Sequence, residues 1–158
     1  MKVAIVMGSK SDYPVVERAE SILRDFGVAY ETRIISAHRT PRIAEDFASK
    51  AEENGIEVII AAAGKAAHLG GVLAAYTAMP IIGLPIKSST LDGLDSLLSM
   101  VQMPKGVPVA TVAIDGAENA ALLAVQILSV KYTEMREKMK NYKRKMEAEI
   151  IKQDQELN

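Results

Sequence analysis

Short apolar segments alternate with longer amphipathic segments along the first 130 residues of the chain. The apolar runs are typical of buried strands, whereas the longer segments repeat apolar residues at the three- and four-residue spacing of a helix face. The predicted strands cover residues 3–7, 29–35, 57–62, 80–85 and 107–114. The predicted helices cover residues 13–26, 41–54, 66–76, 91–102 and 118–128.

This alternation of strands and helices favours a parallel sheet with right-handed crossovers. Five such units predict an α/β protein with a flavodoxin-like three-layer α/β/α sandwich and the strand order 2-1-3-4-5. In that fold, ligands bind at the carboxyl edge of the sheet, in the crevice between the first and third strands.

The last 28 residues follow a different pattern, in which apolar residues mark one face of a long, charged helix. They are Tyr132, Met135, Met139, Tyr142, Met146 and Ile150. A helix so far beyond the last strand has little of its own domain left to cover, so we expect this stripe to pack on a neighbouring subunit. The alternative is a helix that folds back onto its own domain. The chain thus divides into a domain of residues 1–130 and a C-terminal helix of residues 131–158.

Composition narrows the possible functions. The chain has 158 residues, of which 25% are charged and 49% hydrophobic, as expected for one globular domain. Its net charge of −1 gives no reason to expect nucleic acid or an anionic membrane as a partner. The lack of cysteine excludes disulfides, thiol nucleophiles and thiolate metal ligands. No membrane span or signal peptide is recognisable, so we expect a cytoplasmic protein.

The segment Ser36-Ala-His-Arg-Thr-Pro41 places an imidazole beside a guanidinium where the second strand leads into a helix. Thr40 suits the N-cap and Pro41 the first helical position, so His38 and Arg39 belong to the preceding loop. Histidine transfers protons near neutral pH, and arginine binds carboxylates or phosphates. This loop is therefore a candidate site, although on its own it is equally consistent with a surface ion pair and a histidine that fills a gap.

Two further loops lie at the same predicted edge. Gly8-Ser-Lys-Ser-Asp12 follows the first strand and offers a flexible glycine, serine hydroxyls and a helix N-terminus, which together suit an anion. Asp12 suits either a helix cap or an acceptor for ligand hydroxyls. The segment 63–71 follows the third strand and is rich in small residues. It lacks the glycine and the Ser or Thr of a nucleoside-triphosphate loop, and the third strand does not end in the Asp of a phospho-receiver domain.

Four motifs in order resemble class I N5-carboxyaminoimidazole ribonucleotide mutases, the family of the phosphoribosylaminoimidazole carboxylase catalytic subunit. They are Gly8-Ser-Lys-Ser-Asp12, Ser36-Ala-His-Arg-Thr-Pro41, Ala66-Ala-His-Leu69 and Asp95-Ser-Leu-Leu-Ser-Met-Val-Gln-Met-Pro104, and Asn119-Ala-Ala-Leu-Leu-Ala124 also matches. The resemblance covers roughly residues 3–130. It implies an octamer with sites at subunit contacts, no metal or organic cofactor, and a ribonucleotide substrate of purine biosynthesis.

The resemblance also implies roles for residues. His38 matches the proton-shuttling histidine, which delivers a proton to nitrogen and later removes one from C4 as the carboxylate moves between them. Arg39 and Ser9 match positions that hold the phosphate, and Asp12 matches one that holds the ribose. The 64–69 loop matches the one that closes over the carboxylate and excludes water. The expected substrate-binding residues are Gly8, Ser9, Ser11, Asp12, Ser36, Ala37, Arg39, Gly64, Lys65, Ala66, His68 and Leu69.

The chain departs from the family pattern at three places. Lys65 replaces Gly, Gly70 replaces Pro, and the 114–118 loop is shorter than usual. Lys65 either reaches an anionic group or points to solvent, and we favour solvent. The alternatives are an enzyme that carboxylates aminoimidazole ribonucleotide directly with CO₂, which the resemblance associates with Lys after the histidine, and a non-enzymatic nucleotide sensor. A flavin carrier is disfavoured because aromatic residues make up only 4% and Trp is absent.

Overall fold

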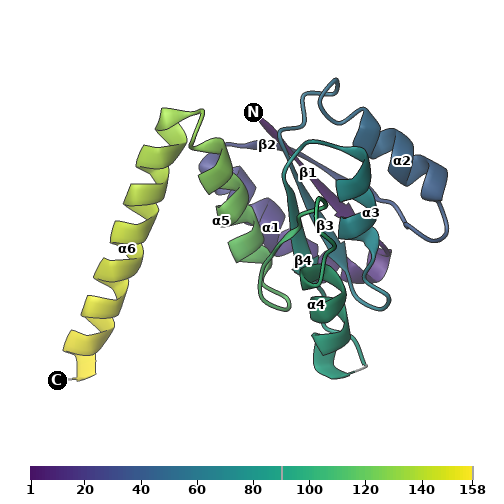
Figure 1. Cartoon of the computed structure of the whole chain (residues 1–158). Coiled ribbons are helices and arrows are strands. Elements are labelled where there is room, and N and C mark those ends of the chain that lie inside the picture. The colour runs from purple at the N-terminus through teal and green to yellow at the C-terminus, as the bar shows by residue number, and fades with distance from the viewer. Residues whose placement is uncertain (90, 158) are drawn as a thin grey trace.

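A parallel five-stranded sheet forms the centre of the protein in the computed structural model, which describes residues 1–89 and 91–157 (Figure 1). The strands are β1 Lys2–Met7, β2 Ala29–Ile34, β3 Val58–Ala63, β4 Ile81–Pro85 and β5 Ala110–Thr111. Their order is β2-β1-β3-β4-β5, which confirms the predicted topology. The reversal of strand order between β1 and β3 opens the crevice that this topology provides for ligands.

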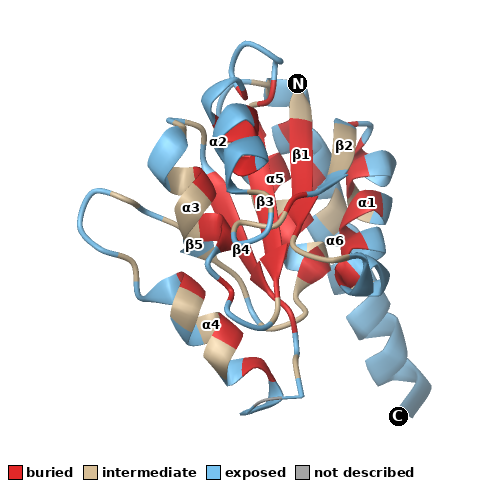
Figure 2. Ribbon diagram, turned by 90° about the vertical axis from the view of Figure 1, so that its right-hand side faces the viewer, coloured by how far each residue is buried: buried red, intermediate tan, exposed pale blue. Residues whose placement is uncertain are grey.

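Helices cover both faces of the sheet, as the three-layer prediction requires. They are η1 Lys10–Asp12, α1 Tyr13–Phe26, α2 Pro41–Ser49, α3 Leu69–Tyr76, η2 Leu91–Gly93, α4 Leu94–Val101, α5 Ala117–Leu128 and α6 Thr133–Leu157. Val3 and Ile5 of β1 pack in the cluster that includes α1 and α5, whereas Ala4 and Val6 pack in the cluster that includes α2 and α3. Because alternate strand residues point to opposite faces, the buried residues 3–7 of β1 separate two apolar layers (Figure 2).

Four predicted elements have wrong boundaries. The second helix ends at Ser49 instead of residue 54, because the chain turns back through Gly55, at a φ of 72°, to bury Ile56. Helix α3 begins at Leu69, since Ala66 adopts a left-handed φ of 47° in the preceding turn.

The other two differences concern β5, the last strand of the sheet, and α4, the helix that precedes it. Strand β5 has only two residues, 110 and 111, where eight were predicted. Pro108 lacks the N–H that a longer ladder on β4 would need. Helix α4 begins at Leu94 because Leu91 and Asp92 have positive φ angles of 49° and 52°.

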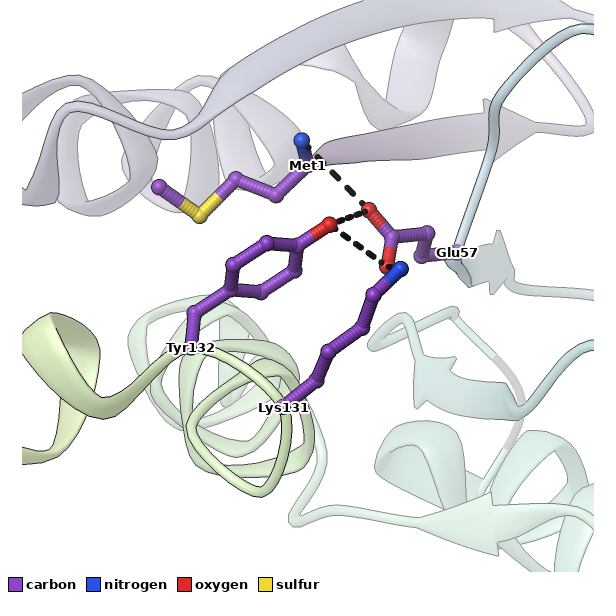
Figure 3. A network of polar contacts seen from close by, with 4 residues as sticks. All are labelled: Met1, Glu57, Lys131 and Tyr132. Atoms are coloured by element: carbon purple, nitrogen blue, oxygen red, sulfur yellow. Dashed lines mark hydrogen bonds and ion pairs between the residues drawn. The ribbon is translucent and has the colours of Figure 1, made fainter.

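A cluster of polar contacts fixes the start of α6 against the sheet (Figure 3). The Glu57 carboxylate accepts a hydrogen bond from the Tyr132 hydroxyl at 2.9 Å and forms an ion pair with the Lys131 ammonium at 3.0 Å. The Met1 amino group lies 3.4 Å from the same carboxylate. Burial raises the pKa of Glu57, but hydrogen bonds from Lys131 and Tyr132 outweigh this effect and lower it.

The first turns of α6 pack on their own domain, and the later turns do not. Met135 and Met139 are buried with α1 and α5, whereas Met146 is 51% and Ile150 64% exposed. In both views the distal half of α6 extends away from the sheet (Figures 1 and 2). Packing of this half on a neighbouring subunit remains a prediction. Among residues 1–89 and 91–157, no helix combines the length and apolarity needed to cross a bilayer.

Candidate active site

A cleft of about 630 Å³ lies at the carboxyl ends of β1, β3 and β4, where the fold predicts a ligand. It brings together the loops that follow β1, β2, β3 and β4, which are far apart in the sequence, and every predicted site residue except His68 lines it. The lining residues are Gly8, Ser9, Ser11, Asp12, Ser36, Ala37, His38, Arg39, Ala63, Gly64, Lys65, Ala66, Leu69, Ile86, Lys87 and Ser88.

Local hydrogen bonds hold the loop that carries His38 and Arg39. The Thr40 hydroxyl accepts from the Ser36 backbone N–H at 3.0 Å and donates to the Ser36 carbonyl at 2.9 Å. Thr40 occupies the N-cap position of α2 as predicted, but its side chain makes no capping hydrogen bond. Its hydroxyl instead closes the loop into a tight turn, so the positions of His38 and Arg39 are fixed relative to β2.

Arg39 connects the loops that follow β1 and β2. Its Nη2 donates to the Gly8 carbonyl at 3.1 Å, and its Nε donates to the Ser36 hydroxyl at 3.3 Å. A guanidinium has five N–H donors, so these contacts orient the group while leaving donors for an anion in the cleft. The arrangement suits a phosphate or a carboxylate.

His38 and His68 are in direct contact. The Nε2 of His38 lies 3.0 Å from the Nδ1 of His68, and the two rings meet edge to face with centroids 5.1 Å apart. One nitrogen must donate and the other accept, so the hydrogen bond couples the tautomers of the two rings. His68 therefore contacts the predicted proton-transfer residue, although it does not line the cleft itself.

The loop after β1 forms a compact group of polar side chains. The Ser9 hydroxyl accepts from the Ser11 backbone N–H at 3.3 Å and from the Ser11 hydroxyl at 2.9 Å. The Ser11 hydroxyl also lies 3.3 Å from the Asp12 carboxylate. Asp12 is only 8% exposed, and this burial raises its pKa despite hydrogen bonds that act in the opposite direction. Because Asp12 makes no capping bond to α1, its carboxylate is available to the cleft.

Sequence reasoning missed the cleft residues around the end of β4. Ile86, Lys87 and Ser88 follow β4, which lies beside β3 in the sheet, so the strand order itself was the signal that could have found them. The backbone N–H of Lys87 donates to the Asp115 carboxylate at 2.8 Å, so the shortened 114–118 loop supports this wall. Lys65 is exposed at the cleft rim.

The cleft brings an imidazole, a guanidinium and a buried carboxylate together in one cavity. Among the described residues (1–89 and 91–157), no three His, Asp or Glu side chains are grouped as metal ligands would be. The arrangement defines a flavodoxin-like α/β protein with a switch-point cleft suited to a small anionic ligand with hydroxyl groups.

Comparison with known proteins identifies the family. Residues 2–149 match the family described as AIR carboxylase, and the chain belongs to this family. It is 64% identical to the N5-carboxyaminoimidazole ribonucleotide mutase of Pyrococcus abyssi, over 92% of this chain and 83% of the relative. It is 56% identical to the mutase of the same name from Thermotoga maritima, over 99% and 91%. A crystal structure of Treponema denticola PurE superimposes with a TM-score of 0.91 at 32% identity, over 99% of this chain and 98% of the other.

Proposed function

We propose that this chain converts N5-carboxyaminoimidazole ribonucleotide to 4-carboxy-5-aminoimidazole ribonucleotide, with His38 as the proton shuttle. Relatives named as the mutase match more than nine-tenths of the chain, so it is an isomerase of purine biosynthesis. The observation that carries the role of His38 is its position in the cleft beside Arg39, with its ring hydrogen-bonded to His68. No cofactor enters the proposed chemistry.

The polar groups of the cleft suggest how the nucleotide binds. Arg39 and Ser9 hold the phosphate, because a guanidinium and a hydroxyl both donate to phosphate oxygens. Asp12 accepts hydrogen bonds from the ribose hydroxyls, which replace part of the solvation that its carboxylate lacks in the buried site. These contacts place the imidazole of the substrate near His38.

The reaction conserves all atoms of the substrate. First the bond between the exocyclic nitrogen and the carboxylate carbon breaks, its electron pair stays on nitrogen, and protonated His38 supplies a proton there. The resulting CO₂ stays in the cleft, and the C4 carbon forms a new bond to it. Neutral His38 then removes the C4 proton and returns to its protonated form. A group with a pKa near the working pH can perform both transfers.

Retention of CO₂ requires a water-poor part of the cleft. Ala63 and Ile86 are each 6% exposed, and Leu69 is 2% exposed. Together with Gly64 and Ala66, they line one side of the cleft with small or apolar groups. Such a surface offers few hydrogen bonds to water, which favours the retention of CO₂. Lys65 extends this loop at the rim, where its ammonium is placed to attract the anionic substrate.

Direct carboxylation of aminoimidazole ribonucleotide is the second candidate function. The family description, AIR carboxylase, favours it. Arg39 after the histidine and the Ala66-Ala-His68 sequence favour the mutase reaction, according to the resemblance. The two functions differ in the first substrate that the enzyme accepts.

The proposed enzyme is a cytoplasmic homo-oligomer, and the resemblance implies an octamer. Two exposed apolar stripes support assembly. One lies on α4, where Leu94, Leu98 and Val101 are 45–51% exposed, and the other is the distal stripe of α6. A closed assembly larger than a simple ring needs two different contact surfaces, and these stripes provide them.

The substitution His38→Asn tests the role of the shuttle. The variant should bind the carboxylated product with an affinity within about tenfold of the parent while losing turnover, since only the proton-transfer group is removed. The comparison variant is His68→Asn, which keeps His38 but changes its partner; it should retain part of the turnover with an altered pH profile. Full activity of His38→Asn would exclude the proposed shuttle. Binding without turnover by the parent chain would instead support a nucleotide sensor.

A further inference from the structure

The segment 86–88 after β4 forms one wall of the cleft, and contacts with other parts of the chain fix its position. The backbone N–H of Ile86 donates to the Ala63 carbonyl at the end of β3, at 2.9 Å. The Ile86 carbonyl accepts a hydrogen bond at 3.0 Å from the hydroxyl of Ser96, a fully buried residue of α4. These two contacts hold Ile86, whereas the backbone of the next residue, Lys87, is held by a third.

Asp115 provides this third contact. Its carboxylate accepts from the Lys87 backbone N–H at 2.8 Å, and its own backbone N–H donates to the Pro85 carbonyl at 2.8 Å. Because the two hydrogen bonds lie on either side of Ile86, they fix the wall against the loop that follows β5. Asp115 itself does not line the cleft, so its influence on a ligand there passes through the wall.

The backbone at Asp115 is suited to this contact. Its φ of 55° lies in the left-handed region, which aspartate and asparagine adopt more readily than most residues with a side chain. Gly116 follows, where a Cβ would lie 2.9 Å from the Ala113 carbonyl oxygen. The chain therefore turns sharply within the 114–118 loop, which is shorter than the family pattern, and this turn directs the Asp115 carboxylate toward Lys87.

Arg18 of α1 holds the same loop from outside the cleft. Its Nη2 donates to the Asp115 carbonyl at 2.7 Å, and its Nη1 lies 3.3 Å from the Glu118 carboxylate in the first turn of α5. Helices α1 and α5 pack together on one face of the sheet (Figure 1). The guanidinium thus ties the 114–118 loop to α1, and Asp115 connects that loop to the cleft wall.

We propose that Asp115 is a positioning residue for the retention of CO₂, and that Arg18 supports it. The inference rests on the proposed mutase function, in which CO₂ stays in the cleft between its release from nitrogen and its addition to C4. Ile86 is one of the buried apolar residues that exclude water from this region. Without the Asp115 carboxylate, the Lys87 N–H loses its acceptor, the wall is displaced more often, and CO₂ escapes before it recombines.

Asp115→Gly and Asp115→Asn separate the role of the carboxylate from that of the backbone. Both replacements suit a left-handed φ, but glycine removes the acceptor for the Lys87 N–H, whereas asparagine keeps an amide oxygen. The matched control is Asp92→Gly. Asp92 also has a positive φ, of 52°, and its carboxylate lies 3.3 Å from the Lys87 ammonium. This control therefore removes a contact with the side chain of Lys87 and not with its backbone.

The measured quantity is the share of the substrate carboxylate that reaches C4. N5-carboxyaminoimidazole ribonucleotide with a radioactive carbon in its carboxylate is turned over in excess unlabelled bicarbonate, and label in the carbon-carboxylated product is counted at early times. The parent should retain most of the label. In Asp115→Gly the share of label lost should rise about threefold to tenfold, the effect of one missing hydrogen bond on the position of the wall.

The other variants should follow the contacts that they keep. Asp115→Asn should restore most of the retention, because its amide oxygen accepts from the Lys87 N–H. Asp92→Gly should match the parent. Arg18→Ala should lose an intermediate share of label, since it loosens the loop and leaves the Asp115 carboxylate in place. The Arg18 side chain is 45% exposed on α1, so this variant still decides the question if Asp115→Gly fails to fold.

The outcomes separate this inference from the proposed function. If the parent retains the label and both Asp115→Gly and Arg18→Ala retain it equally well, the inference is wrong and the mutase function stands. A lower Tm in Asp115→Gly with full retention would mean that Asp115 only stabilises the fold, which also refutes the inference. Equal label loss in Asp92→Gly would show that the contact with the Lys87 backbone is not the cause. A parent that forms no product from this substrate would overturn the function and the inference together.

Discussion

Removal of the Arg39 guanidinium should weaken nucleotide binding in a defined way. In the free protein this group donates to the Gly8 carbonyl and the Ser36 hydroxyl, and both contacts are solvent-exposed. Their loss in Arg39→Ala should therefore change the stability of the fold little, because exposed polar contacts contribute little to it. The main effect should be a lower affinity for the ligand, because its phosphate loses a charged hydrogen-bond donor.

The magnitude follows from the contact that is lost. A hydrogen bond to a charged group contributes about 1.5–3 kcal/mol, so Kd for the nucleotide should rise about 10- to 150-fold in Arg39→Ala. Arg39→Lys should lose less, because it keeps the charge, but it should not restore full affinity since an ammonium lacks the planar fork that also holds Gly8 and Ser36.

Calorimetric titration with the carboxylated product measures these changes, and Arg42→Ala is the matched control. Arg42 is the second residue of α2, is exposed and does not line the cleft, yet its removal changes the net charge equally. If Arg39→Ala and Arg42→Ala both bind the product as tightly as the parent does, Arg39 does not hold the phosphate. An equal weakening in both variants would mean that only overall charge matters.

Three further predictions concern stability. Burial raises the pKa of Asp12 above its unfolded value, so its contribution to stability is present in acid and is lost as pH rises through the folded pKa. Asp12→Asn should therefore raise Tm at pH 7 more than at about pH 3.5. The same substitution should weaken binding of the nucleotide. The pKa of Glu57 is lowered, so Glu57→Gln should reduce the free energy of unfolding in urea by about 1–2 kcal/mol at pH 7. The reduction should become progressively smaller as pH falls through the folded pKa. Tyr132→Phe should show part of the same reduction. Gly83→Ala should destabilise by about 1–3 kcal/mol, because its Cβ would lie 2.9 Å from Val109 Cγ1. Unchanged unfolding midpoints would contradict each prediction.

The sheet order could be predicted because the pattern of buried runs and helices leaves few topologies open. The ends of elements could not, since they depend on tertiary contacts. The short β5 reflects Pro108 beside β4, and the late start of α3 reflects the left-handed turn at Ala66. Neither feature alters hydrophobic periodicity, which was the signal used.

The site was predictable where its residues carry chemistry in recognisable motifs. His38 and Arg39 could be assigned to one cleft because strand order brings their loop beside the one after β1. The contact between His38 and His68 could not be foreseen, because the two residues are 30 positions apart and their distance depends on side-chain geometry. Ile86 and Lys87 were missed because they belong to none of the recognised motifs, although the strand order places the end of β4 beside the cleft.

The most direct test of the central claim is a comparison of two substrates with the purified protein. N5-carboxyaminoimidazole ribonucleotide is supplied in bicarbonate-free buffer, and aminoimidazole ribonucleotide is supplied with bicarbonate in a parallel reaction; the carbon-carboxylated product is followed in both. The proposed mechanism predicts fast turnover of the first substrate, with loss of that turnover in His38→Asn. Turnover of the second substrate alone would contradict the mutase function and identify a direct carboxylase.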